Sequence, residues 1–227
     1  MKITSREDID ADQFIFDAIK KDNKYENVLV QHDYEIKFLD KKFQCCVGVV
    51  DIVNSTRLTS LLNPSRLTDY YSIFLNNLLF IATKFGAIIA KITGDGFLYY
   101  FPNIDGNTEE NITKCISCNL MMTKNRSNIN EILGNSQLPF IDYRISSEWG
   151  DVLISPIKIK NAIYEDIYGV AVNLCVKINH LAPPNKFVIG NDMFKLAKDL
   201  PNFSFKKIGT PSYGFYEYGV YQVELKV

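Results

Sequence analysis

A valine-rich apolar run, CCVGVVDIV, spans residues 45–53 and predicts a buried β-strand. Asp51 lies near the end of this run, and Asn54, Ser55 and Thr56 follow it directly. Residues of these types can satisfy the free amide groups at the start of a helix. The segment therefore predicts a strand that carries a carboxylate at its end and passes into a helix.

The residues that follow predict an amphipathic helix and then a hairpin. Asn63-Pro64 is typical of a helix start, apolar residues recur behind it at helical spacing, and Gly86 ends the pattern. Two apolar runs, AIIAKI and FLYYFP, come next and are typical of strands. Between them, Asp95-Gly96 is a strong signal for a two-residue hairpin turn.

The rest of the chain continues to alternate between helical and strand patterns. The expected elements are a helix at 108–131, strands at 139–146 and 149–155 around a bend, a polar connection at 155–165, a helix at 169–181, a strand at 186–190, a helix at 193–200, a strand at 203–209 and a strand pair at 214–225. This order predicts an α+β fold with one mainly antiparallel sheet and helices packed on one face.

Composition fits one globular domain with a short N-terminal arm. The chain has 227 residues, is 47% hydrophobic and carries a net charge of −1, so we expect neither a nucleic-acid partner nor a membrane. Residues 1–40 hold 16 charged side chains and predict a partly helical arm that packs on the main domain or on a partner. The polar N-terminus is unlike a signal peptide, so we expect a cytoplasmic protein with free thiols, including Cys115 and Cys118 on one helix.

Two aspartates stand where the predicted topology would bring them together. Asp51 ends the first strand, and Asp95 lies in the hairpin, which can neighbour that strand in the sheet. Two carboxylates at one sheet edge repel each other unless a cation neutralises them, and oxygen ligands suit Mg²⁺ or Mn²⁺. The alternative from spacing alone is that Asp51 caps a helix and Asp95 only makes a turn.

Four sequence motifs occur in an order that resembles one known family. They are VGVVDIVNSTRLT, KITGDGFLYYF, YRISSEWGDV and DIYGVAVNLCVKINHLAPP. Together they resemble the class III nucleotidyl cyclase domain, the adenylate/guanylate cyclase family, over about residues 43–225. The resemblance implies a ferredoxin-like cyclase homology domain at residues 41–227.

The resemblance also implies which residues bind the metals and the phosphates. Asp51 and Asp95 match the two metal-binding aspartates, and the Ile52 carbonyl would help to hold one of two divalent cations, Mg²⁺ or Mn²⁺. Arg144 matches an arginine that contacts the terminal phosphates. The backbone amides that would bind the triphosphate belong to Asn54, Ser55 and Thr56.

A second group of residues matches the part of the family site that binds the nucleoside. Lys91 and Asp166 match the pair that recognises the base, and Asn173 matches the asparagine that orients the ribose. Lys177 stands where the family has its transition-state arginine. Asn173 and Lys177 are four residues apart on a predicted helix and therefore share one face.

The resemblance implies a homodimer with two shared active sites. In the family one protomer supplies the metals, and the other supplies the base-binding pair, the asparagine and the cation. The reaction would be attack of the ribose 3′-oxygen on the α-phosphorus with loss of pyrophosphate. A nucleoside triphosphate is therefore the expected partner, and a monomer should be inactive.

Several substrates and one other function remain open from the residues themselves. A lysine donor beside an aspartate acceptor matches adenine and opposes guanine, which favours ATP, but cytosine presents the same pattern. CTP is thus an alternative, as in the pyrimidine cyclases of bacterial antiphage systems. Lys177 lacks the planar fork of arginine, and Tyr213 stands where the family has a triphosphate-binding lysine. A weakly active, nucleotide-binding regulatory domain is the other alternative.

Overall fold

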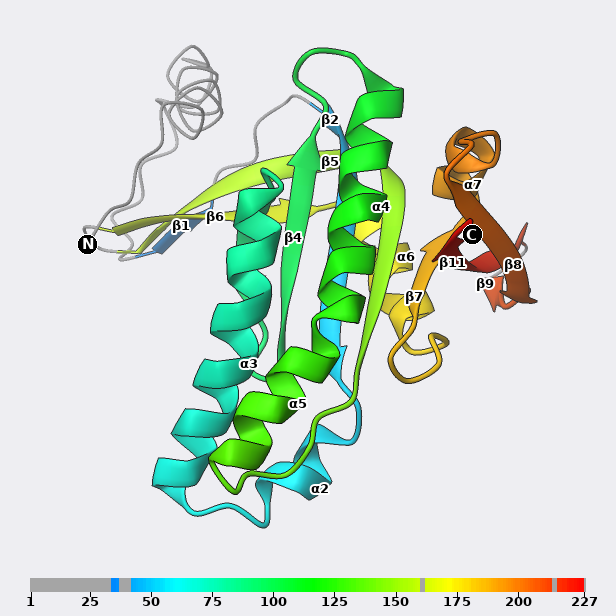
Figure 1. The fold of residues 1–227 in the computed structure, drawn as a ribbon. Coiled ribbons are helices and arrows are strands. Elements are labelled where there is room, and N and C mark those ends of the chain that lie inside the picture. Colours follow the sequence, from blue (N-terminus) through cyan, green and yellow to red (C-terminus); the bar gives the residue numbers. More distant parts are fainter. Residues whose placement is uncertain (1–33, 37–41, 160–161, 214–215, 227) are drawn as a thin grey trace.

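The computed structural model describes residues 34–36, 42–159, 162–213 and 216–226 (Figure 1). The predicted helix of the N-terminal arm, over residues 9–19, lies outside these residues. One short piece of the arm is described: β1 (Tyr34–Ile36) pairs antiparallel with the far end of β5 (Tyr143–Ile159). This part of the arm therefore packs on the main domain. No helix among the described residues is long and apolar enough to cross a membrane.

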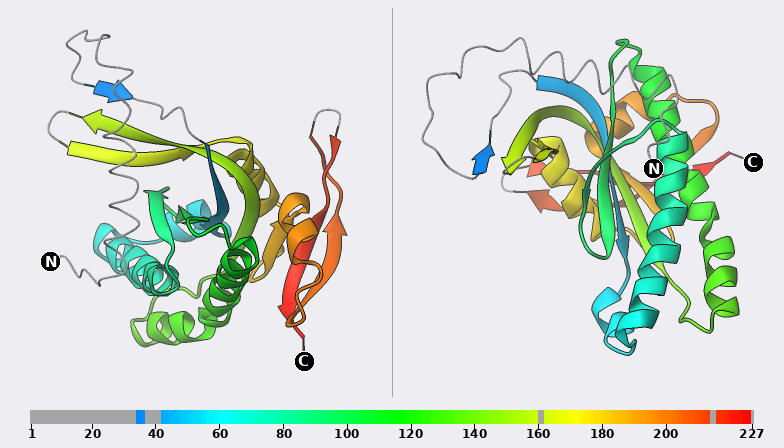
Figure 2. Two further views of the ribbon diagram at one scale, coloured as in Figure 1. Left: turned by 90° about the horizontal axis from the view of Figure 1, so that it is seen from above. Right: turned by 90° about the vertical axis from the view of Figure 1, so that its left-hand side faces the viewer.

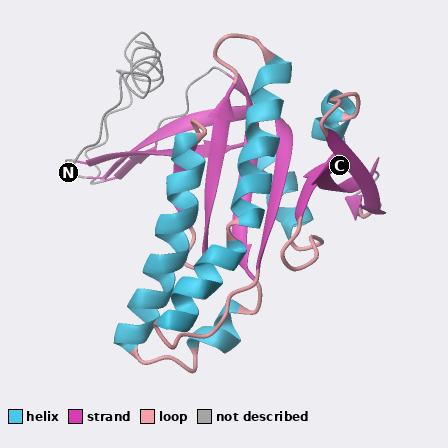
Figure 3. Ribbon diagram, in the orientation of Figure 1, coloured by secondary structure: helices cyan, strands magenta, loops and turns pink. Residues whose placement is uncertain are grey.

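Helices and strands alternate through the described residues (Figure 3). The helices are α2 (Ser55–Thr59), α3 (Pro64–Lys84), α4 (Thr108–Lys124), α5 (Arg126–Asn135), α6 (Val170–Asn179) and α7 (Asn191–Ala197). The remaining strands are β2 (Lys42–Ile52), β3 (Ile88–Ile92), β4 (Gly96–Pro102), β6 (Ala162–Tyr168), β7 (Phe187–Gly190), β8 (Phe203–Gly209), β9 (Ser212–Tyr213), β10 (Tyr216–Glu217) and β11 (Val220–Leu225).

One large sheet confirms the predicted α+β fold. Its strand order is β3-β4-β2-β5-β7-β11-β8, with β1 and β6 also paired to β5. Of the described pairs in this sheet, β5 and β7 are parallel and the others are antiparallel. The two central strands β2 and β5 run side by side from Lys42↔Leu153 to Ile52↔Tyr143. This long pairing places the end of β2 next to the start of β5.

The central strand β2 is buried on both faces, which explains its continuous apolar sequence. Cys46 and Val50 contribute to the core under α3 and α4, whereas Cys45 and Val47 contribute to the core under α6. The sheet thus carries α3 and α4 on one face and α6 on the other (Figure 2), so the expectation that the helices pack on one face is wrong for α6. An outward-facing side of α6 is left for other contacts.

Helix α3 forms where its capping residues predict it. The Asn63 side chain accepts a hydrogen bond from the Arg66 amide at 3.0 Å, and Pro64 occupies the first helical position. Its core-facing residues are fully buried: Tyr70, Phe74, Leu78 and Ala82. Gly86 ends the helix with a φ of +85°, a conformation that favours glycine.

Four local predictions need correction, and three of them concern turns and breaks. The hairpin is present, but its turn residues are Gly94 and Asp95, because Gly94 takes the positive φ of +91° and Gly96 already pairs in β4. The helix expected at 108–131 is two helices, α4 and α5, that meet at Asn125. The strands expected around a bend are one continuous strand, β5.

The polar connection expected at 155–165 is wrong for a physical reason. Residues Leu153–Ile159 of β5 pair with β6, so hydrogen bonding rather than apolar content defines this hairpin. Ile154 and Ile167 are buried apolar residues of this hairpin. The sequence did carry a strand signal, because Ile157 and Ile159 alternate with Pro156 and Lys158.

All five cysteines are free and buried, as expected for the thiols. Cys115 and Cys118 lie together on α4 and are fully buried. Burial raises the pKa of Cys45 to about 12 and raises that of Cys118 beyond its usual range. These thiols therefore stay protonated and act as core side chains.

A buried carboxyl group joins the central sheet to the C-terminal part of the fold. Glu148 on β5 accepts hydrogen bonds from the amides of Trp149 and Met193, each at 2.8 Å, and from the Tyr218 hydroxyl at 2.6 Å. Burial, with a smaller effect of the nearby Asp192, raises the pKa of Glu148 from 4.5 to about 7 in spite of these bonds. The group therefore changes its charge near neutral pH.

We expect Glu148→Gln to flatten the pH dependence of stability. A raised carboxyl pKa stabilises the folded state fully below the ordinary pKa, and this contribution is lost as the pH rises through about 7. Between about pH 5 and about pH 8 the wild-type free energy of unfolding should fall by about 1–3 kcal/mol more than that of the variant. Urea unfolding at both pH values measures this difference, and equal pH slopes would contradict it.

Candidate active site

Asp51 and Asp95 come together at the end of β2 that leads into α2. Asp51 is the Cα partner of Gly96 on β4, and the Ile52 amide donates to the Asp95 carbonyl at 3.1 Å. Burial and the charge of Asp95 raise the pKa of Asp51, which Arg144 lowers in part. The two carboxylates therefore repel each other across a half-buried space, as predicted from the sequence.

The donor groups at this end of the sheet suit a hard divalent cation. They comprise the two carboxylates and the backbone carbonyl of Ile52, all of them oxygen ligands. Within the described residues, no group of three or more histidine, cysteine, aspartate or glutamate side chains could hold a metal. Such a two-carboxylate set leaves coordination positions for phosphate oxygens and water, which is the usual arrangement for Mg²⁺.

The turn between β2 and α2 is built around the second carboxylate. Ser55 donates its hydroxyl hydrogen to Asp95 Oδ2, and Asn54 adopts a left-handed conformation with a φ of +56°. The Asn54 side chain makes no capping hydrogen bond, contrary to the simple capping interpretation. Ser55 and Thr56 open α2, and the first amides of a helix have no partner within it.

Arg144 points toward this carboxylate pair. It is the Cα partner of Asp51, and its Nε lies 3.9 Å from Asp51 Oδ2. Its Nη1 donates to the His180 carbonyl at 3.2 Å. The guanidinium therefore links the Asp51 carboxylate to the end of α6.

Sequence reasoning missed two residues at the end of α6. The charge of His180 lowers the pKa of Asp51. Asn179 is buried and donates to the Val49 carbonyl at 3.2 Å and the Arg144 carbonyl at 3.5 Å. Their only sequence signal was their place two and three residues after Lys177, within the fourth motif.

Lys91 and Asp166 form a direct ion pair, although they are 75 residues apart. Lys91 Nζ lies 2.5 Å from Asp166 Oδ2, and Asp166 Oδ1 accepts the Ile167 amide at 2.9 Å. The Asp166 side chain is 10% exposed and that of Lys91 is 55% exposed. The hydrogen bond to Asp166 raises the pKa of Lys91. The two residues thus form one donor–acceptor unit on β3 and β6.

Asn173 and Lys177 lie on the exposed side of α6. Ala171, Cys175 and Ile178 of the same helix face the core. Because Asn173 and Lys177 are four residues apart, they are neighbours on one helix face. They point away from the sheet on which α6 packs.

The structure gathers the predicted residues into separate groups. The first contains Asp51, Asp95, Ser55 and Arg144, and the second is the Lys91–Asp166 pair. The third is the Asn173–Lys177 face of α6. Tyr213 lies in β9, where its backbone pairs with Tyr216.

Comparisons with known proteins identify the family and the fold of the chain. The family model of the adenylate and guanylate cyclase catalytic domain matches residues 39–213. The adenylyl cyclase CyaB from P. aeruginosa is similar in structure, with a TM-score of 0.75 at 20% identity over 84% of this chain and 96% of that one. No curated protein matches the sequence.

Two guanylyl cyclases are also similar in fold. Cya2 has a TM-score of 0.69 at 17% identity, covering 81% of this chain and 92% of its own. The dimeric guanylyl cyclase domain of the RhoGC fusion protein from the aquatic fungus Blastocladiella emersonii has a TM-score of 0.70 at 15% identity, covering 82% and 99%. Because the family match spans most of the sequence, the chain belongs to the adenylate and guanylate cyclase catalytic domain family and is a class III nucleotidyl cyclase domain.

Proposed function

We propose that this cyclase converts ATP to 3′,5′-cyclic AMP and pyrophosphate at the interface of a homodimer. The observation that carries the proposal is the convergence of Asp51 and Asp95 at one sheet end, in a chain that also forms the Lys91–Asp166 pair. The first pair suits divalent cations, and the second suits adenine. Each protomer thus holds both the phosphate half and the base half of a site.

The phosphate half binds and orients the triphosphate. Asp51, Asp95 and the Ile52 carbonyl would hold two cations, Mg²⁺ or Mn²⁺. When bound, these cations supply a lowered pKa for the ribose 3′-hydroxyl and charge neutralisation on the leaving phosphates. Arg144 and the amides of residues 54–56 bind the phosphate oxygens and align the α-phosphorus for in-line attack.

The nucleoside half comes from the partner protomer. Asn173 orients the ribose so that its 3′-oxygen faces the α-phosphorus, and Lys177 stabilises the charge that develops on the phosphate. The 3′-oxygen then bonds to the α-phosphorus as the bond to pyrophosphate breaks. Lysine makes a single point contact where arginine makes two, so turnover should be slower by about one to two orders of magnitude.

The base-binding pair favours adenine over guanine. Lys91 donates to an acceptor such as adenine N1, and Asp166 accepts from the 6-amino group. Guanine presents the reverse pattern and would place a donor against Lys91. Cytosine presents the same pattern as adenine, so the size of the pocket decides between ATP and CTP.

A panel of nucleotides tests the proposal. The purified protein is incubated with Mn²⁺ and ATP, GTP, CTP or UTP separately, and products are identified by chromatography and mass. We expect cyclic AMP as the main product. Cyclic CMP or UMP in its place would show a pyrimidine cyclase. Binding of nucleotide without any cyclic product would show a regulatory domain, which the lysine at position 177 and the tyrosine at 213 would explain.

We expect Asp166→Ala to weaken the selection of the base. The variant leaves Lys91 without its acceptor partner, so ATP loses one oriented hydrogen bond and kcat/KM should fall by about 10- to 100-fold. Steady-state kinetics with ATP and GTP measure both the loss and the relaxed preference. The control is Glu109→Gln, an exposed residue of α4, which should behave as wild type. Unchanged selectivity in Asp166→Ala would remove this pair from base recognition.

A further inference from the structure

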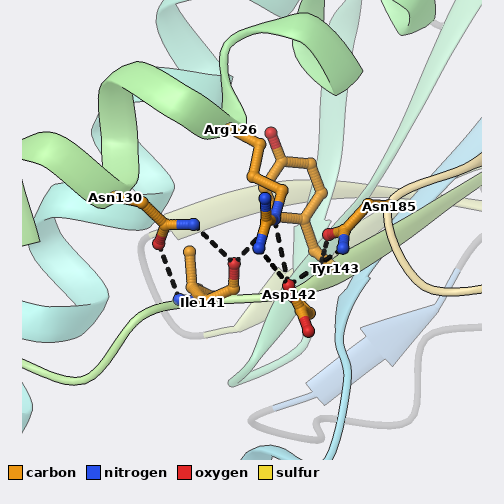
Figure 4. Close-up of polar contacts among 6 residues, drawn as sticks. All are labelled: Arg126, Asn130, Ile141, Asp142, Tyr143 and Asn185. Atoms are coloured by element: carbon orange, nitrogen blue, oxygen red, sulfur yellow. Dashed lines mark hydrogen bonds and ion pairs between the residues drawn. The ribbon is translucent and has the colours of Figure 1, made fainter.

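A polar cluster stands at the entrance to β5, two residues before Arg144 (Figure 4). Asp142 Oδ1 accepts from Arg126 Nε at 3.0 Å and Nη2 at 2.6 Å, and from Asn185 Nδ2 at 2.9 Å. Burial tends to raise the pKa of Asp142, but the hydrogen bonds from Asn185 and Arg126 outweigh it and lower the pKa. Asp142 therefore stays ionised and ties together α5 and the loop between α6 and β7.

The backbone around Asp142 is held from both sides. The Asn130 side chain accepts from the Ile141 amide at 2.7 Å and donates to the Ile141 carbonyl at 3.1 Å. On the other side, the Asn185 amide donates to the Tyr143 carbonyl at 2.7 Å, and Asn185 Oδ1 accepts the Tyr143 amide at 3.3 Å. The segment 141–143 thus has a defined path although only its last residue is in a strand.

This segment is hydrogen-bonded to the chain that directly follows Asp51 and Ile52. The Val53 amide donates to the Asp142 carbonyl at 2.8 Å, and Val53 follows Asp51 and Ile52 in the chain. On the neighbouring strand, Arg144 is the Cα partner of Asp51. The position of Asp142 therefore bears on the Ile52 carbonyl through Val53 and on the Asp51 carboxylate through Arg144.

We propose that Asp142, held by Arg126 and Asn185, is a positioning residue that aligns Asp51, the Ile52 carbonyl and Arg144 for binding the metal ions and the triphosphate. Asp142, Arg126 and Asn185 themselves would not touch the substrate. The proposal rests on the proposed function only in taking Asp51 as a metal ligand. Residues that orient metal ligands commonly change metal affinity by about 10- to 100-fold when they are removed.

The exposure of the Asp142 and Arg126 side chains distinguishes a positioning role from a purely structural one. The Asp142 side chain is 45% exposed and that of Arg126 is 35% exposed. Ion pairs at such exposure add little to folding stability. A purely structural pair should therefore leave metal binding unchanged, whereas a positioning pair should weaken it more than it weakens the fold.

The test measures Mn²⁺ binding in the presence of a non-cyclisable ATP analogue, by titration calorimetry or by the resonance signal of free Mn²⁺. We expect Asp142→Ala to bind Mn²⁺ about 10- to 100-fold more weakly than wild type. Asp142→Asn keeps an oxygen for Arg126 and Asn185 and should recover most of the affinity. The matched control is Glu110→Gln, which removes an exposed ion pair to Lys114 on α4 and should bind Mn²⁺ as wild type does.

Each outcome decides the proposal. Wild-type affinity for Mn²⁺ in a folded Asp142→Ala protein overturns it, as does an equal loss in Glu110→Gln. Should Asp142→Ala fail to fold, Asn185→Ser replaces it, with weakened binding in support and unchanged binding against. A wild-type protein that binds Mn²⁺ but forms no cyclic nucleotide would refute the proposed function and leave this test intact.

Discussion

Asp51→Asn and Asp95→Asn should each lower the rate of cyclic nucleotide formation by about three orders of magnitude or more. Each substitution keeps the size of the side chain but removes one negative charge from a site that would hold two divalent cations. Asparagine still offers one oxygen, yet it is a far weaker ligand for Mg²⁺ than a carboxylate. Initial rates with saturating Mn²⁺ and ATP measure the effect.

The stability of these variants distinguishes loss of a ligand from loss of the fold. Burial and the charge of Asp95 raise the pKa of Asp51, so the ionised group destabilises the folded protein as the pH rises through that pKa. Asp51→Asn removes this penalty, and its thermal midpoint at neutral pH should equal or exceed that of wild type.

A matched control excludes a general effect of charge. Asp105 is an exposed aspartate between β4 and α4, and Asp105→Asn should have wild-type activity. If Asp51→Asn or Asp95→Asn cyclises ATP as fast as Asp105→Asn does, the two aspartates do not bind the catalytic metals.

The central strand and the two aspartates were predictable because local sequence specifies them. A strand buried on both faces needs apolar residues throughout, and CCVGVVDIV provides them. Asp51 interrupts this run at its end, and Asp95 sits in a turn that Gly94 makes possible. The hairpin prediction, although misplaced by one residue, was enough to bring the carboxylates to one edge.

The β5–β6 hairpin was missed because its many polar residues obscured the alternation of Ile157 and Ile159. Pro156 and Lys158 on β5 have little strand preference, but both lie in register with residues of β6. The break between α4 and α5 at Asn125 was also missed, because a single asparagine does not mark the end of a helix unambiguously.

The contacts among Arg126, Asp142 and Asn185 could not be predicted from the sequence. Arg126, Asp142 and Asn185 lie far apart in the chain, and each resembles an ordinary surface or loop residue. Only the packing of α5 and the loop after α6 brings them to one carboxylate oxygen. Glu148 is comparable, because nothing local indicates that this carboxyl group is buried.

Two inactive variants should restore each other when the site is shared. Asp95→Asn damages the phosphate half of a site, and Asn173→Ala damages the nucleoside half. In a mixed dimer one site receives both defects and the other receives neither. Random exchange makes about half of the dimers mixed, so the activity should return to about one quarter of the wild-type value.

The most direct test of the shared, metal-dependent site is therefore the cyclic AMP production of an equimolar, subunit-exchanged mixture of Asp95→Asn and Asn173→Ala, with each variant alone as reference. Our account predicts that the separate variants are almost inactive and that the mixture regains about one quarter of the wild-type rate. A mixture no more active than the two proteins measured apart, although dimers have exchanged, would show that each protomer works with its own residues and would contradict the account.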